Sequence, residues 1–356
     1  MAYKLNEKIR DLRPYDPITG NYQIRLDANE SFVTVSNDLL DKITYEIKNI
    51  SYNRYPDPMA SELCKSFAEY YNVKHELVTA GNGSDELISV IFNAFLMKGD
   101  KILTLSPDFS MYSFYSSIVE AECIQMKKEQ DLTIDIDKLI ACANNENVKL
   151  IIFSNPCNPT SLGIKKGKVR KLIKSVNALV VLDEAYMDFW NESLLDEVES
   201  YDNLIILRTC SKALGMAGIR LGFAVANLKI TNALKAVKSP YNVNLLTQKI
   251  GSIVLNEHQL NKSSINKIIS SRDKLYSSML DIEQSNKGKL HVYPTVTNFI
   301  FLNIPCCFAE KIYNYLLKCG IAVRLMGNYL RITAGTEEEN EEFLKYFKKS
   351  LENIEV

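Results

Sequence analysis

Several residue patterns that mark common site chemistries are missing from this sequence. It has only three histidines, widely separated, and its eight cysteines include no Cys-x-x-Cys pair. Zinc sites of the usual spacing and histidine-rich metal sites are therefore not expected. There is no Gly-x-Ser-x-Gly elbow either, which argues against a serine–histidine–aspartate triad.

Excess charge and long apolar runs are also absent. The formal net charge is -1 over 356 residues, so we expect neither nucleic acid nor an acidic membrane surface as a partner. No apolar run approaches the length of a membrane span, and the first residues lack a signal-peptide core. We therefore expect a cytoplasmic protein whose cysteines are reduced thiols.

What the sequence does contain is a series of strand-length apolar runs that alternate with helical patterns from about residue 75 to 230. This alternation predicts an α/β domain with a mostly parallel sheet covered by helices on both faces. After residue 240, a long helical stretch and a few short strands predict a second, smaller α/β domain. We divide the chain into an N-terminal arm that packs on the small domain or on a partner subunit (1–35), a large domain (36–240) and a small C-terminal domain (241–356).

The segment from Arg208 to Phe223 is the most informative stretch of the chain. It follows an apolar run, Leu204–Leu207, that is typical of a buried strand, and it contains hydroxyls, glycines, Lys212 and Arg220. The end of a strand in an α/β sheet is where ligands bind. We predict that Lys212 holds a cofactor covalently.

Other strand ends carry polar groups that a ligand needs. Asp183 directly follows an apolar strand, and the glycine-rich turn Gly81–Glu86 opens a helix, an arrangement that suits a phosphate. The turn Asn155–Thr160 contains two Asn-Pro steps that stiffen it, and Phe109 follows a further strand. Taken singly, each feature also has an ordinary structural explanation as a helix cap, a stiff turn or a core aromatic.

Together these groups meet the needs of pyridoxal 5′-phosphate (PLP). PLP requires an amine for a Schiff base, an acid at the pyridine nitrogen and hydrogen-bond donors at the ring oxygen. Its phosphate requires amides, hydroxyls and an arginine, whose planar fork matches phosphate oxygens. Lys212 is the candidate for the amine and Asp183 for the acid, and Asn158 and Tyr186 are the candidates for the ring-oxygen donors. The candidates for the phosphate site are Gly83, Ser84, Asp85, Thr209, Ser211 and Arg220.

The order of these motifs resembles the fold-type I aminotransferases. The matching elements are Gly-Ser-Asp-Glu, Asn-Pro-x-Asn-Pro-Thr, Asp-Glu-Ala-Tyr, Thr-x-Ser-Lys and Leu-Arg-Ile-Thr. The resemblance spans nearly the whole chain and implies a large domain with a mostly parallel seven-stranded sheet, a smaller α/β C-terminal domain, PLP as cofactor and no metal. Within the superfamily, the chain resembles most the histidinol-phosphate aminotransferases, through Arg13-Pro14-Tyr15, Leu26–Glu30, Asn53–Pro56 and Leu330–Thr336.

The resemblance implies catalytic roles for three residues. Lys212 would carry the cofactor and shuttle a proton, Asp183 would pair with the ring nitrogen, and Tyr186 would hydrogen-bond the ring oxygen. Phe109 would stack on the ring. Tyr55 would reach the cofactor phosphate of the neighbouring subunit, which implies a homodimer with shared active sites.

Substrate binding is implied at four further positions. Arg331, together with Arg324, would bind the anionic end of the substrate, whether a carboxylate or a phosphate. Asn29 and Tyr15 would line the substrate pocket. The implied reaction is amino transfer between L-histidinol phosphate and 2-oxoglutarate, giving imidazole acetol phosphate and glutamate, a step of histidine biosynthesis.

Alternatives share much of this pattern. Aromatic amino acid aminotransferases and threonine-phosphate decarboxylases carry several of the same motifs. A non-enzymatic regulator is disfavoured, because such proteins usually carry an appended DNA-binding domain for which the chain has no room.

Two departures from the family pattern stand out. Ser161 follows Thr160 where the family usually has glycine. A serine fits there if its φ is negative, whereas a positive φ costs strain. Gly215-Met216 replaces the more usual bulky pair after the lysine.

Overall fold

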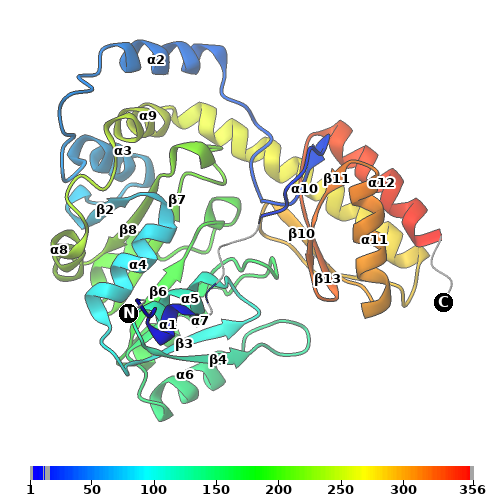
Figure 1. The fold of residues 1–356 in the computed structure, drawn as a ribbon, viewed down its shortest axis with the longest axis horizontal. Coiled ribbons are helices and arrows are strands. Elements are labelled where there is room, and N and C mark those ends of the chain that lie inside the picture. Colours follow the sequence, from blue (N-terminus) through cyan, green and yellow to red (C-terminus); the bar gives the residue numbers. More distant parts are fainter. Residues whose placement is uncertain (1–2, 11, 13–16, 353–356) are drawn as a thin grey trace.

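The computed structural model describes residues 3–10, 12 and 17–352. The protein has two lobes, each with its own sheet and hydrophobic core. The long helix α10 (His258–Ser285) runs from the large lobe into the small one, as Figure 1 shows.

The large lobe is built on a seven-stranded sheet in the order β2-β8-β7-β6-β5-β3-β4. Strand β8 is antiparallel to both of its neighbours, and the remaining pairs are parallel. This confirms the α/β architecture with a mostly parallel sheet. The strands are β2 (Val78–Gly81), β3 (Lys101–Ser106), β4 (Glu122–Lys127), β5 (Leu150–Ser154), β6 (Leu179–Asp183), β7 (Leu204–Thr209) and β8 (Gly222–Ala226).

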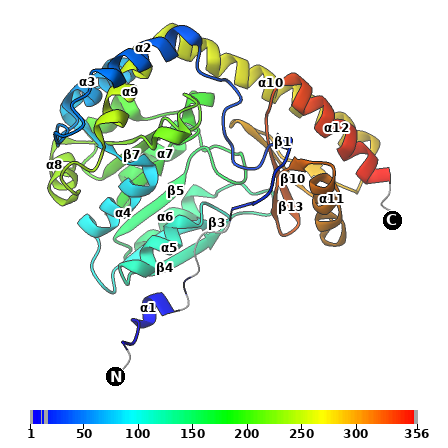
Figure 2. The same ribbon diagram turned by 45° about the horizontal axis from the view of Figure 1, so that its top comes forward.

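Helices cover both faces of this sheet, which explains why its inner strands are apolar throughout (Figure 2). Val180 and Leu182 of β6 join one core cluster, whereas Val181 joins the cluster on the opposite face. One cluster includes residues of α2 (Asn37–Lys48), α3 (Ser61–Tyr71), α6 (Ile136–Asn145), α7 (Lys166–Ser175) and α9 (Leu245–Asn256). The other includes residues of α4 (Gly83–Phe95), α5 (Met111–Ile118) and α8 (Leu228–Val237).

The small lobe has a four-stranded sheet in the order β12-β13-β10-β9. Its neighbouring strands are antiparallel. Phe343 and Phe347 of the last helix lie fully buried in its core. The elements are β9 (His291–Val292), β10 (Phe299–Asn303), α11 (Cys306–Lys318), β11 (Ile321–Ala322), β12 (Arg324–Met326), β13 (Tyr329–Thr333) and α12 (Glu337–Glu352).

Near the N-terminus lies the short helix α1 (Glu7–Arg10), and the described residues from 17 onward reach the small lobe. Strand β1 (Ile24–Arg25) pairs in parallel with β11. The backbone N–H of Leu26 then donates to the Ala322 carbonyl at 2.8 Å, and the Thr333 N–H donates to the Leu26 carbonyl at 2.9 Å. Residues 27–30 are thereby anchored beside the small sheet, facing the large lobe.

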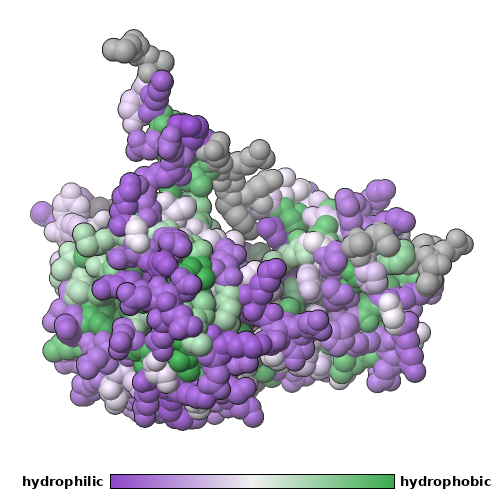
Figure 3. Space-filling view, turned by 90° about the horizontal axis from the view of Figure 1, so that it is seen from below, coloured by the Kyte–Doolittle hydropathy of each residue, from purple (hydrophilic) through white to green (hydrophobic). Residues whose placement is uncertain are grey.

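Short 3₁₀ turns complete the connections. They are η1 (His75–Leu77), η2 (Met187–Phe189), η3 (Leu195–Ser200) and η4 (Ala217–Ile219). The face seen in Figure 3 is mostly hydrophilic, with apolar residues in small groups. Across residues 3–10, 12 and 17–352, no helix combines the length and apolarity that a membrane crossing requires.

Candidate active site

A cavity of about 720 Å³ lies where the carboxyl ends of the large-sheet strands meet residues 25–30 and strands β12 and β13. Thirteen of the residues singled out from the sequence line it. They are Asn29, Ser84, Asp85, Phe109, Asn158, Asp183, Tyr186, Thr209, Ser211, Lys212, Arg220, Arg324 and Arg331.

Lys212 stands in the turn after β7, and its Nζ donates a hydrogen bond to the Ala28 carbonyl at 3.0 Å. Burial, reinforced by the positive charges of Arg331 and Arg220, lowers the pKa of Lys212 to about 8, against the opposing charges of Glu30 and Asp85. A larger fraction of this amine is therefore neutral near neutral pH than in an exposed lysine. A neutral amine is the form that attacks a carbonyl or accepts a proton.

Asp183 ends β6 and is buried. The Tyr112 hydroxyl donates to its Oδ2 at 2.9 Å, and the Ala185 N–H donates to its Oδ1 at 3.2 Å. Burial raises the pKa of Asp183 to about 7, although the Tyr112 hydrogen bond acts in the opposite direction. A carboxylate held in this way gains from a cationic partner, because such a partner offsets its desolvation. Sequence reasoning missed Tyr112, whose aromatic ring is indistinguishable from a core residue in the helix pattern.

The amino end of α4 forms the floor of one end of the cavity. Gly83 has a φ of +83°, and a Cβ added to it would lie 2.7 Å from Nη2 of Arg220. A Cβ on Gly222 would lie 2.5 Å from the backbone nitrogen of Ser84. The two glycines therefore let Arg220 and the start of α4 approach closely. Free amides at a helix start beside an arginine favour an anion there.

Hydroxyls complete this end of the cavity. Thr209 Oγ1 donates to Ser211 Oγ at 3.0 Å, and both residues are buried. Arg220 Nη2 lies 3.5 Å from the Asp85 carboxylate across the mouth of the sheet. The group as a whole offers amides, hydroxyls and a guanidinium, the donor set that a phosphate requires. Gly83 itself is behind this surface and does not line the cavity.

Two arginines occupy the opposite end. Arg324 of β12 and Arg331 of β13 are paired across the small sheet. Arg331 Nη1 donates to Asn158 Oδ1 at 2.5 Å, and its Nη2 donates to the Asp27 carbonyl at 2.7 Å. A residue of the small lobe therefore bonds a residue of the large lobe directly at the site.

Asn29 also joins elements that are distant in sequence. Its Nδ2 donates to the Tyr186 hydroxyl at 2.8 Å, its backbone N–H donates to Thr333 Oγ1 at 3.0 Å, and its φ is +54°. Burial raises the pKa of Tyr186 to about 12, opposed by the charge of Arg331. Tyr186 therefore remains a neutral hydroxyl near neutral pH, able to donate a hydrogen bond to an acceptor in the cavity.

Phe109 and Asn158 lie on two loops that are linked by hydrogen bonds through the carboxylate of Asp108. Asp108 accepts from the Phe109 N–H at 2.8 Å and from the hydroxyl of Ser154, and Ser154 Oγ accepts from the Asn158 N–H at 3.0 Å. Lys128 lies nearby, with its Nζ 2.8 Å from Cys157 Sγ. Sequence reasoning missed this support, since Lys128 stands in another segment of the chain and only the fold brings it to the turn.

Ser161 adopts the strained alternative of the two considered from the sequence. Its φ is +61°, in the region that favours glycine, and it is fully buried. Its hydroxyl lies 2.8 Å from the Pro294 carbonyl, and its own carbonyl accepts from the Val296 N–H at 3.1 Å. The serine thus has backbone strain that a glycine would not have, together with a hydrogen bond to the small lobe that a glycine could not make.

Like Gly83, Tyr55 is a predicted site residue that does not line the cavity. Tyr55 is 81% exposed and stacks on Tyr241, with ring centroids 4.6 Å apart. Tyr15 lies outside the described residues, as does the Arg13-Pro14-Tyr15 motif.

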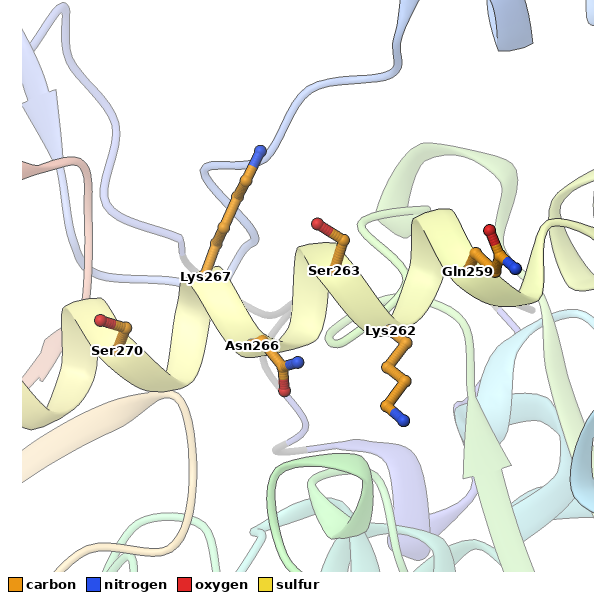
Figure 4. Close-up of a pocket in the computed structure, with 6 residues that line it drawn as sticks. All are labelled: Gln259, Lys262, Ser263, Asn266, Lys267 and Ser270. Carbon is orange, nitrogen blue, oxygen red and sulfur yellow. The ribbon is translucent and has the colours of Figure 1, made fainter.

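A second hollow, of about 500 Å³, lies along α10 and is lined from that helix alone. Figure 4 shows its six side chains pointing to different sides of the helix. They do not converge on a ligand position, so the cavity at the strand ends is the candidate active site. Among the described residues, no cluster of three potential metal ligands is found.

Known proteins similar to this chain carry the same fold. The family model for aminotransferase class I and II matches residues 21–347. The histidinol-phosphate aminotransferase of Clostridium novyi (strain NT) is 41% identical over 345 residues, which are 96% of this chain and 95% of that protein.

Solved structures have the same fold as this chain. The histidinol-phosphate aminotransferase of Sinorhizobium meliloti in complex with pyridoxal 5′-phosphate superposes with a TM-score of 0.88, at 21% identity and over 98% of both chains. That of Clostridium acetobutylicum has a TM-score of 0.84 at 25% identity, over 93% of this chain and all of the other. The resemblance noted in the sequence is thereby confirmed: this chain belongs to the aminotransferase class I and II family, among the histidinol-phosphate aminotransferases.

Proposed function

We propose that this enzyme transfers an amino group between L-histidinol phosphate and 2-oxoglutarate, giving imidazole acetol phosphate and glutamate. The observation that carries the proposal is one cavity that holds Lys212 and Asp183 at the sheet and Arg324 and Arg331 opposite them. Near-full-length relatives at 35–41% identity that bear this activity in their names support it.

The residues present fit the cofactor of the family, PLP. The cradle at the start of α4 offers a phosphate site, Asp183 offers a buried carboxylate for the ring nitrogen, and Lys212 offers a neutral amine. We propose that Ser84, Asp85, Thr209, Ser211 and Arg220 form the phosphate site, with Phe109 stacking on the ring. Gly83 does not line the cavity, and its role is to let Arg220 approach the start of α4. When bound, PLP supplies an aldehyde for the amine and a ring that accepts electrons from the substrate.

Each residue at the sheet end of the cavity then has a separate role. Lys212 Nζ, with its lowered pKa, would take the proton from the amino-bearing carbon of the substrate and give it to the carbon that the PLP aldehyde supplies, on the other side of the nitrogen. Asp183 would stay ionised beside a cationic ring nitrogen, and Tyr112 and the Ala185 N–H hold its carboxylate in place. Tyr186 and Asn158 would donate hydrogen bonds to the ring oxygen and so hold the ring in position.

Substrate binding falls to the opposite wall. Arg331 and Arg324 receive the phosphate of one substrate and the carboxylate of the other in turn, since a guanidinium fork fits both anions. Asn29, and Tyr15 beyond the described residues, line the pocket beside them. The bond from Arg331 to Asn158 couples the anion site to the cofactor turn.

We further propose a cytoplasmic homodimer with shared sites, built from an arm (1–35), a cofactor domain that begins at residue 36 and a small C-terminal domain. Helix α9 (Leu245–Asn256) packs in the core of the large lobe, so the cofactor domain extends beyond the boundary expected at residue 240. The position of Tyr55 supports the dimer. Its ring is exposed and does not line the chain's own cavity, so a role at a cofactor phosphate would require a neighbouring subunit.

Substrate turnover tests the proposal. The enzyme is loaded with PLP and offered histidinol phosphate, phenylalanine or threonine phosphate with 2-oxoglutarate, and glutamate formation is measured. We expect the highest kcat/KM with histidinol phosphate. Preferential conversion of phenylalanine, or release of carbon dioxide from threonine phosphate, would instead support the aromatic or decarboxylase alternative.

A further inference from the structure

Among the described residues, one acidic side chain of the cavity makes neither a hydrogen bond nor an ion pair. Four acidic residues line it: Asp27, Glu30, Asp85 and Asp183. The partners of the other three are Arg25 for Asp27, Arg220 for Asp85, and Tyr112 for Asp183. Within residues 3–10, 12 and 17–352, Glu30 makes no hydrogen bond and no ion pair.

Glu30 is nevertheless held in a defined place. The preceding residue, Asn29, is buried and bonded to Tyr186, Thr333 and Asn298. Ala28, two residues before Glu30, accepts the hydrogen bond from Lys212. The backbone that carries Glu30 is thus fixed beside the catalytic lysine, whereas its side chain is exposed to the cavity.

Its charge is opposite to that of the anion site. Arg324 and Arg331 gather positive charge where a phosphate or carboxylate binds, and a carboxylate at Glu30 repels such an anion. Glu30 is therefore suited to another part of the substrate, one that donates a hydrogen bond. Besides the phosphate, the hydrogen-bonding groups of L-histidinol phosphate are the amine, which would react with the cofactor held at Lys212, and the imidazole ring, whose N–H is a donor.

We propose that Glu30 accepts a hydrogen bond from the imidazole ring of the amino substrate and thereby selects imidazole over a plain aromatic ring. This inference rests on the proposed function. A site built to hydrogen-bond a substrate N–H discriminates strongly against an analogue that lacks it, because the site's polar group is then left unpaired. A carboxylate also attracts the protonated imidazolium, which strengthens the bond below the pKa of the ring.

The test compares two substrates that differ only in the ring. Histidinol phosphate and its phenyl analogue, phenylalaninol phosphate, share the amine and the phosphate. Their kcat/KM values are measured for the PLP-loaded wild type, Glu30→Ala and Glu30→Gln, with glutamate as a third amino donor. Glu341→Ala is the matched control, since Glu341 is an exposed glutamate on α12.

We expect Glu30→Ala to lose about tenfold to one-hundredfold in kcat/KM for histidinol phosphate. Glu30→Gln retains a neutral acceptor and should lose less, while the phenyl analogue and glutamate stay within about threefold of the wild type. The wild-type preference for histidinol phosphate should also rise as pH falls through about 6.5, where imidazole protonates, and Glu30→Ala should abolish that rise.

Two results would overturn the inference. An equal loss for all three amino donors would mean that Glu30 serves Lys212 or the fold rather than the ring, with the proposed function left standing. A wild type that prefers the phenyl analogue would refute the proposed function and, with it, this role of Glu30.

Discussion

The two ends of the cavity are built in different ways. The sheet end (Ser84, Asp183, Thr209, Lys212) consists of residues that end or follow strands of one mostly parallel sheet, or open the helix after a strand. The arginine end (Asn29, Arg324, Arg331) consists of residues from the N-terminal segment and two strands of the small lobe. The first is assembled by sheet geometry, which brings carboxyl ends of parallel strands together, and the second by tertiary pairing between remote segments.

Because the two ends are built differently, we expect substitutions at each end to impair a different part of the enzyme's function. Substitutions at the sheet end should remove the chemistry and leave anion binding, whereas those at the arginine end should change substrate affinity and the environment of Lys212. The following experiments probe the comparison.

The largest effect is expected at Lys212. Lys212→Ala should lose transamination by at least about 10⁴-fold, because it removes both the covalent attachment and the proton carrier. The visible absorbance of the lysine-bound cofactor should disappear. An unchanged absorbance band would show that another amine holds the cofactor.

The second largest effect is expected for Asp183→Asn. It is isosteric but removes the charge opposite the ring nitrogen, and kcat should fall by about 10²- to 10³-fold. Tyr112→Phe serves as the comparison. It deletes one hydrogen bond to Asp183 and should cost less than about tenfold. Equal losses in the two variants would show that the hydrogen bond, not the charge, is what matters.

The arginine end can be probed through the acidity of Lys212. The folded-state pKa of about 8 lies below the usual 10.5, so the apo-protein's rate of cofactor attachment should rise with pH through about 8. Arg331→Gln should move this midpoint upward, because Arg331 is a cation that lowers the pKa of Lys212. A midpoint near 10.5 in the wild type would contradict the expected burial of the amine.

The lowered pKa of Lys212 also makes the unfolding free energy of the apo-protein depend on pH. Between pH 8 and 10.5 the unfolded chain binds a proton at Lys212 that the folded chain does not. The unfolding free energy of the apo-protein should therefore rise with pH across that window through this group. Chemical denaturation of the wild type and of Lys212→Met at several pH values measures the contribution.

The smallest effect concerns the contact of Ser161 between the lobes. Ser161→Ala keeps the positive φ but loses the bond to Pro294, so it should destabilise by about 1 kcal/mol. Ser161→Gly also loses that bond but relieves strain of about 1 kcal/mol, so its stability should stay close to that of the wild type. A glycine variant less stable than the alanine variant would show that strain is unimportant at this position.

Much of the sheet end was predictable because its signals are local. A buried apolar run followed by a charged or hydroxyl residue marks a strand end, and parallel strands bring such ends together. Lys212, Asp183 and Ser84 were found in this way. Tyr112 and Asp108 were not, since their roles depend on which side chain each one touches across the sheet.

The sequence by itself determined the fold class, the cofactor chemistry and the residues at the sheet end, because periodicity and strand-end residues act over short distances along the chain. Only the tertiary structure decided that Ser161 takes a positive φ, that Asn29 bonds Tyr186 and that Arg331 reaches Asn158. It also decided that Glu30 lines the cavity with no hydrogen bond or ion pair to the part of the chain that the structure describes. Those outcomes depend on how the small lobe and the N-terminal segment pack against the large sheet, which residue spacing does not encode.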